Sequence, residues 1–69
     1  MNAVVKNLVL NATKVNGLKV QEIMSYVIEQ LTPTQYKEVE DFLNWCIKNN
    51  KKFGWGNIDE RVQEFKDSL

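Results

Sequence analysis

The clearest hydrophobic pattern lies in the middle of the chain, where apolar residues recur at spacings of three and four. Between residues 20 and 31 they are Val20, Ile23, Met24, Val27, Ile28 and Leu31. At 100° per residue these positions share an arc of roughly 140°, which is one face of an α-helix. Pro33 disfavours helical geometry at the residue before it, so this helix, predicted over residues 18 to 31, ends there.

The next helix begins at that proline. Thr32 can cap it, Pro33 suits its first turn, and Gln35 is placed to complete a capping box. The apolar residues of this helix again share roughly 140° of arc; they are Tyr36, Val39, Phe42, Leu43, Cys46 and Ile47. Trp45 widens the arc to about 200°. Residues 33 to 49 are therefore predicted to form a helix with more apolar surface than one neighbouring helix can cover.

A last helix is predicted after a link rich in asparagine, lysine and glycine. Asparagine tolerates left-handed backbone geometry and glycine permits it freely, so residues 49 to 56 are expected to form a tight irregular link. Asn57 can cap a helix over residues 58 to 68. Its apolar residues form a stripe of about 60°; they are Ile58, Val62, Phe65 and Leu69. A helix this short is marginal alone, so it must dock.

The first 19 residues fit two structures. An arc of roughly 140° favours a helix over about residues 3 to 15 and leaves Leu10 alone on the polar side. The residues on this arc are Val4, Val5, Leu8, Val9, Ala12 and Val15. The alternative is a β-hairpin, because Asn16-Gly17 is a typical hairpin turn. The alternation that a half-buried strand needs breaks at residues 8 to 10, which favours the helix.

These elements predict one small all-α domain over residues 1–69, a bundle of three or four short helices with the N-terminal hairpin as the open alternative. A domain of this size buries only about 60% of its unfolded surface. With one cysteine and no histidine, the chain can form neither an internal disulfide nor a zinc site of nitrogen and sulfur ligands. We therefore expect self-association, most simply as a two-fold homodimer that covers the surplus apolar arc.

Composition and charge exclude several classes of protein. The formal net charge is zero, which argues against a strongly cationic nucleic-acid binder. No apolar run approaches the ~20 residues of a membrane span, and the first residues lack a signal-peptide core. The chain is rich in asparagine and has more lysine than arginine, which suggests an AT-rich coding genome. We expect a cytoplasmic protein of a bacterium or of a phage-infected host cell.

The residues needed for catalysis are scarce. Without histidine the commonest general base is missing, and Cys46 lies on the apolar arc of its helix, where a thiol behaves as a small hydrophobe. Glu38, Glu40 and Asp41 are close in sequence, but a helix turns them in different directions. Gly54 lacks the sequence context of a phosphate-binding loop. We therefore expect no enzyme, no cofactor and no metal site.

The function that the pattern favours is binding to another protein, as a small regulator or inhibitor that acts through an apolar, aromatic helical surface. Several large side chains exceed what one small core can absorb, and aromatic residues of this kind are enriched at interface hot spots. The predicted contact residues are Trp45, Phe53, Trp55 and Tyr26, and Leu10 belongs to the same surplus. In the alternative, Phe53 and Trp55 fold back as plugs over the open end of the bundle and leave no site.

A nucleic-acid-binding regulator is the second hypothesis. In the stretch KNNKKFGWGN, residues 48 to 57, Lys48, Lys51 and Lys52 could contact phosphates while Phe53 or Trp55 stacks on a base. Three lysines neutralise only a few phosphates, so the affinity would be low and sensitive to salt.

One stretch resembles a known element. LTPTQYKEVEDFLNW, residues 31 to 45, is similar to the Leu-Pro, Glu-Val, Asp-Phe helix of some small antitoxins from toxin–antitoxin pairs. The resemblance covers under a quarter of the chain, and this chain has Leu-Thr-Pro in place of Leu-Pro. It implies an antitoxin-like regulator, but we assign no family from it.

Overall fold

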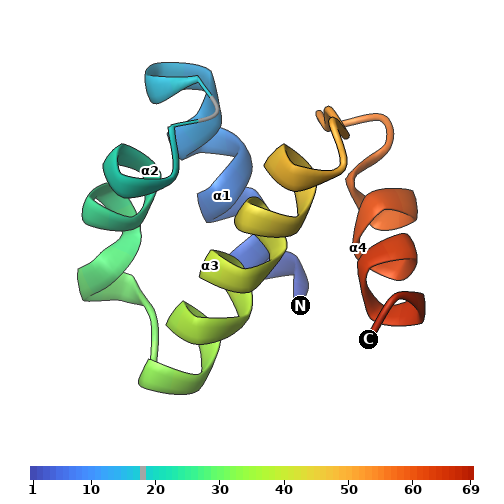
Figure 1. The fold of residues 1–69 in the computed structure, drawn as a ribbon. Coiled ribbons are helices and arrows are strands. Elements are labelled where there is room, and N and C mark those ends of the chain that lie inside the picture. Colours follow the sequence, from blue (N-terminus) through green and yellow to red (C-terminus); the bar gives the residue numbers. More distant parts are fainter. Residues whose placement is uncertain (18) are drawn as a thin grey trace.

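The computed structural model describes residues 1–17 and 19–69, and every regular element within them is a helix (Figure 1). The α-helices are α1 (Ala3–Asn16), α2 (Val20–Val27), α3 (Pro33–Lys48) and α4 (Ile58–Asp67), and a 3-10 turn, η1 (Ile28–Gln30), extends α2. The described residues contain no strand, so the predicted all-α fold is confirmed and the hairpin alternative is wrong. The predicted start of the second helix, at residue 18, lies outside the described residues.

Local hydrogen bonds explain where α1 begins and ends. The Asn2 side chain accepts a hydrogen bond from the backbone N–H of Val5 at 2.9 Å and so caps the first turn. At the other end Gly17 has φ 65°, and its N–H donates to the carbonyl of Thr13 at 2.7 Å. The Asn16-Gly17 pair therefore ends a helix, because glycine reaches this left-handed φ without a steric cost.

The junction between η1 and α3 forms as the sequence predicts. The Thr32 hydroxyl accepts from the backbone N–H of Gln35 at 3.2 Å, and the Gln35 side chain accepts from the backbone N–H of Thr32 at 3.0 Å. This reciprocal capping box, with Pro33 in the first turn, fixes the start of α3.

The helices pack in chain order, α1 on α2, α2 on α3 and α3 on α4. Figure 1 shows α3 in the centre, with α2 on one side of it and α4 on the other. Buried apolar residues from all four α-helices form one continuous core. They are Val5, Val9, Leu10, Ala12, Ile23, Met24, Val27, Val39, Phe42, Leu43, Cys46, Ile58, Val62 and Phe65.

The wide apolar arc of α3 is covered mostly within the chain, by two helices and not by one. Because α3 lies between α2 and α4, it can bury two sides at once. The α4 side is an aromatic cluster made of Phe42, Trp45, Phe53 and Phe65. In this cluster the ring centroid of Phe42 lies 6.4, 5.4 and 5.6 Å from those of Trp45, Phe53 and Phe65. Ile47, predicted to lie on the apolar arc, is at the edge of that arc and is 51% exposed, so its predicted burial is wrong.

The buried side of α1 differs from its predicted apolar arc. Val4 and Val15 are 68% and 67% exposed, whereas Leu10, expected on the polar side, is only 5% exposed. The buried arc is thus rotated by roughly 90° from the most apolar one. The rotation arises because α1 packs against α2 on one side while the chain around Trp55 and Ile58 lies beside Leu10 on the other.

Candidate functional site

The link between α3 and α4 starts with a defined helix-ending motif. Asn50 has φ 54°, its N–H donates to the carbonyl of Ile47 at 3.2 Å, and the N–H of Lys51 donates to the carbonyl of Cys46 at 2.8 Å. These two bonds around a left-handed residue are a Schellman motif. The expected left-handed asparagine is confirmed, and the chain turns sharply there toward α4.

The rest of the link is tied to α4 by side chains. Arg61 Nε donates to the carbonyl of Lys52 at 2.9 Å. Asn57 Oδ1 accepts from the backbone N–H of Gly54 at 2.7 Å, and Asn57 Nδ2 donates to the Lys52 carbonyl at 3.4 Å. Asn57 is at the N-cap position as predicted, but its side chain bonds back to the link and makes no capping bond to α4. The segment that carries Trp55 is therefore held at both ends.

Charged side chains add a second connection between link and helix. Glu64 lies 2.6 Å from Arg61 Nη1 and 3.2 Å from Lys51 Nζ. Hydrogen bonds, first from Arg61 and then from Lys51, lower the pKa of Glu64 from its ordinary value. Lys51 is thus engaged within the chain, while Lys48 and Lys52 are exposed.

The structure separates the four aromatic residues that the sequence singled out. Trp45 and Phe53 are partly buried in the aromatic cluster, where the ring centroid of Trp45 is 5.9 Å from that of Phe65. Trp55 is 63% exposed and Tyr26 is 50% exposed. The plug alternative is therefore correct for Phe53 and wrong for Trp55.

Trp55 lies between two hollows on the surface of α1. The larger, of about 340 Å³, is lined by Leu10, Thr13, Lys14, Phe53, Gly54 and Trp55. The smaller, of about 200 Å³, is lined by Ala3, Lys6, Asn7, Leu10, Trp55, Ile58 and Asp59. Leu10 and Trp55 line both hollows, and we call the two neighbouring hollows together the α1 groove.

The two halves of the α1 groove differ in charge. In the smaller hollow Lys6 Nζ bonds to the carboxylate of Asp59, so its charges are balanced. The larger hollow contains Lys14 and no acidic residue. Among the described residues Lys14 takes part in none of the ion pairs.

Sequence reasoning identified Trp55 but missed the α1 side of the groove, namely Thr13, Lys14 and Lys6. The useful signal was Leu10, which stands alone on the polar side of a helix. Such a residue indicates that a second element lies against that side, and here this element is the link. Which part of the link covers Leu10 is not encoded in the periodicity.

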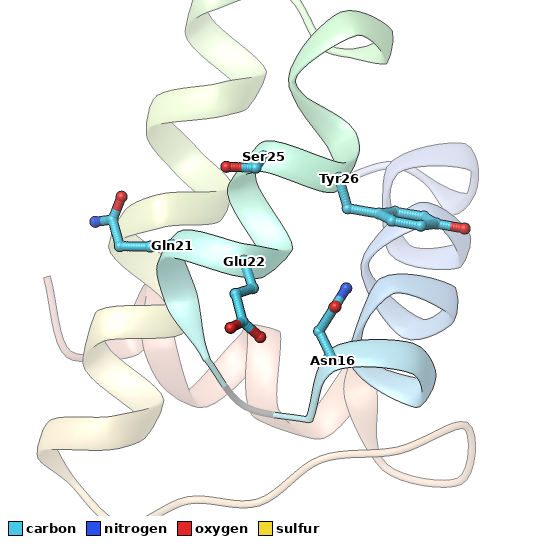
Figure 2. Close-up of a pocket in the computed structure, with 5 residues that line it drawn as sticks. All are labelled: Asn16, Gln21, Glu22, Ser25 and Tyr26. Carbon is cyan, nitrogen blue, oxygen red and sulfur yellow. The ribbon is translucent and has the colours of Figure 1, made fainter.

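Tyr26 belongs to a different hollow, at the α1–α2 corner. It is wide and shallow, about 450 Å³, and is lined by Asn16, Gln21, Glu22, Ser25 and Tyr26 (Figure 2). Figure 2 shows that Tyr26 extends toward α1 while Gln21 and Ser25 point the opposite way. Because the polar groups do not converge on one point, they do not form a binding site for a small ligand.

Reactive chemistry is not favoured at the one cysteine. Cys46 is fully buried, and burial raises the pKa of its thiol to about 11, so the nucleophilic thiolate is disfavoured. The described residues contain no group of three or more histidine, cysteine or acidic side chains that could hold a metal ion. None of their helices is both long enough and apolar enough to span a bilayer.

Comparisons with known proteins do not assign the chain to a family. No family model matches it, and neither the curated proteins nor the solved structures contain a match. Function therefore has to be inferred from the residues of the chain themselves.

Proposed function

We propose that this chain is a non-enzymatic, protein-binding regulator that contacts its partner through the α1 groove. The observation that carries the proposal is Trp55, a large aromatic side chain that is mostly exposed between two hollows. Full burial of a large apolar side chain is worth about 1.5–3 kcal/mol, so covering this ring would favour association. Tryptophan that fills or flanks a pocket is also the typical centre of an interface hot spot.

The geometry of the link supports this role. Asn57 bonds to Gly54 on one side of Trp55, and Arg61 bonds to the Lys52 carbonyl further back. A ring presented by a backbone that is already fixed loses less conformational entropy on binding than a ring on a free loop. The groove is thus preorganised for a partner.

The direct test is affinity capture from the native cell with the purified protein as bait. We expect a stoichiometric partner protein that is retained by the wild type and lost with Trp55→Ala. Ile28→Ala is the matched control, because Ile28 is also exposed and apolar but is not among the groove residues. Equal capture by both variants, or no partner at all, would contradict the proposal.

Self-association remains a prediction, and the structure suggests where to test it. Val4, Leu8 and Val15 form a stripe along α1 that the core leaves uncovered or only partly covered. A homodimer could bury this stripe against its own copy. Light scattering should then show two copies per particle, and Val4→Glu combined with Val15→Glu should return the protein to one copy. A wild type that scatters as a single copy at high concentration would end this idea.

The nucleic-acid alternative is less favoured. It needs Lys48, Lys51 and Lys52 to face phosphates together, but Lys51 is engaged by Glu64. Phe53, one of the two rings proposed to stack on bases, packs against Phe42 in the aromatic cluster.

A cytoplasmic setting in a bacterium or a phage-infected cell is proposed together with the protein-binding role.

A further inference from the structure

We infer that the α1 groove binds an acidic amphipathic helix of a partner protein, which places one apolar side chain in each hollow and an acidic side chain beside Lys14. This inference rests on the proposed function and specifies the chemistry of the partner. Three properties of the groove lead to it, namely its charge, its spacing and its lining.

The charge of the groove walls favours an acidic partner. The first 21 residues, which include α1, contain lysines but no acidic residue, and the same is true of residues 48 to 57 in the link. The acidic residue that lines the groove, Asp59, is already bonded to Lys6. Among the described residues, no ion pair neutralises Lys14, the basic residue that lines the larger hollow. Complementary charge at such a rim accelerates association and selects the partner.

The spacing of the hollows favours a helix over a strand. On α1 the smaller hollow is lined by residues 3 to 10 and the larger one by residues 10 to 14. Their centres are about six residues apart, or roughly 9 Å along the axis at 1.5 Å per residue. Side chains at i and i+7 of a partner helix are about 10.5 Å apart and share one face. Same-face residues of a strand are about 6.6 or 13 Å apart, so the helix spacing is the nearer match.

The lining of the hollows favours a protein side chain over a nucleotide or a small ligand. Leu10, Phe53, Trp55 and Ile58 supply apolar surface, and Lys14 is the basic residue of the larger hollow. Volumes of about 340 and 200 Å³ lie at or below the lower end of small-molecule pockets, about 300–1,000 Å³. A single strand of nucleic acid would instead need a continuous row of unpaired cations and stacked aromatic rings.

The experiment uses a fluorescein-labelled, alanine-rich peptide of about 18 residues, long enough to be partly helical. Leucines stand at i and i+7, alanines at i+3 and i+4 leave room for Trp55, and glutamates stand one turn outside each leucine. A second peptide has lysine at every glutamate position, and an oligothymidine strand serves as the nucleic-acid probe. Fluorescence anisotropy at low salt measures the three affinities. We expect the affinity for the acidic peptide to be at least about tenfold higher than that for the lysine peptide.

Two matched charge reversals locate the acidic contact. Lys14→Glu and Lys66→Glu change the net charge equally, but Lys66 lies in the last turn of α4 and is not among the groove residues. We expect Lys14→Glu to weaken binding of the acidic peptide about fivefold or more, because an attraction becomes a repulsion, while Lys66→Glu has little effect. In ¹⁵N-edited NMR spectra the indole N–H of Trp55 should shift during the titration and that of Trp45 should not.

The possible failures are distinguishable. Equal affinity for both peptides, or equal losses with the two reversals, would overturn the acidic partner. If binding then still depends on Trp55, the proposed protein-binding function survives. Tighter binding of oligothymidine than of the acidic peptide would replace both ideas with nucleic-acid binding. If no peptide binds, the helical partner is wrong, and the affinity capture decides separately whether a protein partner exists.

Discussion

The two tryptophans of this chain lie ten residues apart but in contrasting environments. Trp45 stacks at an interplanar angle of 19° on Phe42 and also contacts Phe65, so its ring helps to join α3 to α4. Trp55 leaves most of its ring in solvent over the α1 groove. The contrast separates a ring that packs within the fold from a ring that the fold leaves mostly uncovered.

The link between α3 and α4 creates this contrast. Phe53 and Trp55 are two residues apart, a spacing that would place both side chains on one face of a regular strand. A turn begins at Trp55, however, so Phe53 packs in the cluster while Trp55 stays exposed. Arg61 and Asn57 fix the backbone between them. Variants in the cluster, in the link and in the groove should therefore have effects of decreasing size on the stability of the fold.

The largest effect is expected in the aromatic cluster. Phe42→Ala removes the ring at its centre, and large-to-small changes of this kind cost about 3–5 kcal/mol. A chain of this length has a total stability of roughly 3–10 kcal/mol, so the variant should be largely unfolded at 37 °C. Urea unfolding followed by far-UV circular dichroism measures the loss. Ile47→Ala, at an exposed position on the same helix, is the control and should unfold close to the wild type.

An intermediate effect is expected when the link is released. Arg61→Ala removes the bond to the Lys52 carbonyl and the ion pair with Glu64, with an expected cost of about 1–2 kcal/mol. Hydrogen exchange should increase at the amide of Gly54, which the Asn57 side chain protects. Arg61→Lys keeps the charge but not the planar fork, so it should recover only part of the loss. Unchanged exchange in Arg61→Ala would show that Asn57 alone orders the link.

Acidification should weaken the same connection more mildly. Hydrogen bonds from Arg61 and Lys51 hold the pKa of Glu64 below the ordinary value of about 4.3. The stabilisation is therefore complete above that pH and is lost as the pH falls through the lowered folded-state pKa. Urea midpoints of the wild type and Glu64→Gln should differ at pH 7 and converge toward pH 3. A difference that does not change with pH would exclude a role for the carboxylate charge.

The smallest effect on stability is expected at the groove. Trp55→Ala should change the free energy of unfolding by about 0.5 kcal/mol or less, the usual range for an exposed position. Trp45→Ala is the direct comparison, and it should cost several times more because the ring packs in the cluster. Equal losses in the two variants would show that Trp55 also supports the fold, and the contrast between the two regions would disappear.

The helix ends were predictable because their causes are local. Thr32, Pro33 and Gln35 form the capping box that their order predicts, and Asn50 adopts the left-handed geometry that asparagine tolerates. The positions buried on α3 and α4 also follow their apolar stripes closely, apart from the exposed Ile47 and Leu69. In each case the deciding interaction lies within a few residues along the chain, or within one helical face.

The candidate site was predictable only at its aromatic residues. The asparagine and glycine residues around Phe53 and Trp55 predicted that both lie in the link. Nothing in the order of the two residues indicates which ring enters the core. Lys14 and Leu10 are about forty residues away in sequence and form the other wall. Leu10 was expected to belong to the apolar surplus that the core leaves uncovered, and its burial shows that this expectation was wrong.

The amino-acid sequence by itself determined three helices, the caps that separate them and the scarcity of groups for acid–base catalysis, and it left a helix or a hairpin open for the first 19 residues. The tertiary structure decided the rotation of α1, the fate of the two tryptophans and the pairing of charges at Lys6 and Lys51. The physical reason is the range of the interactions. Caps and periodic faces depend on neighbours in the chain, whereas burial depends on which segments meet in space.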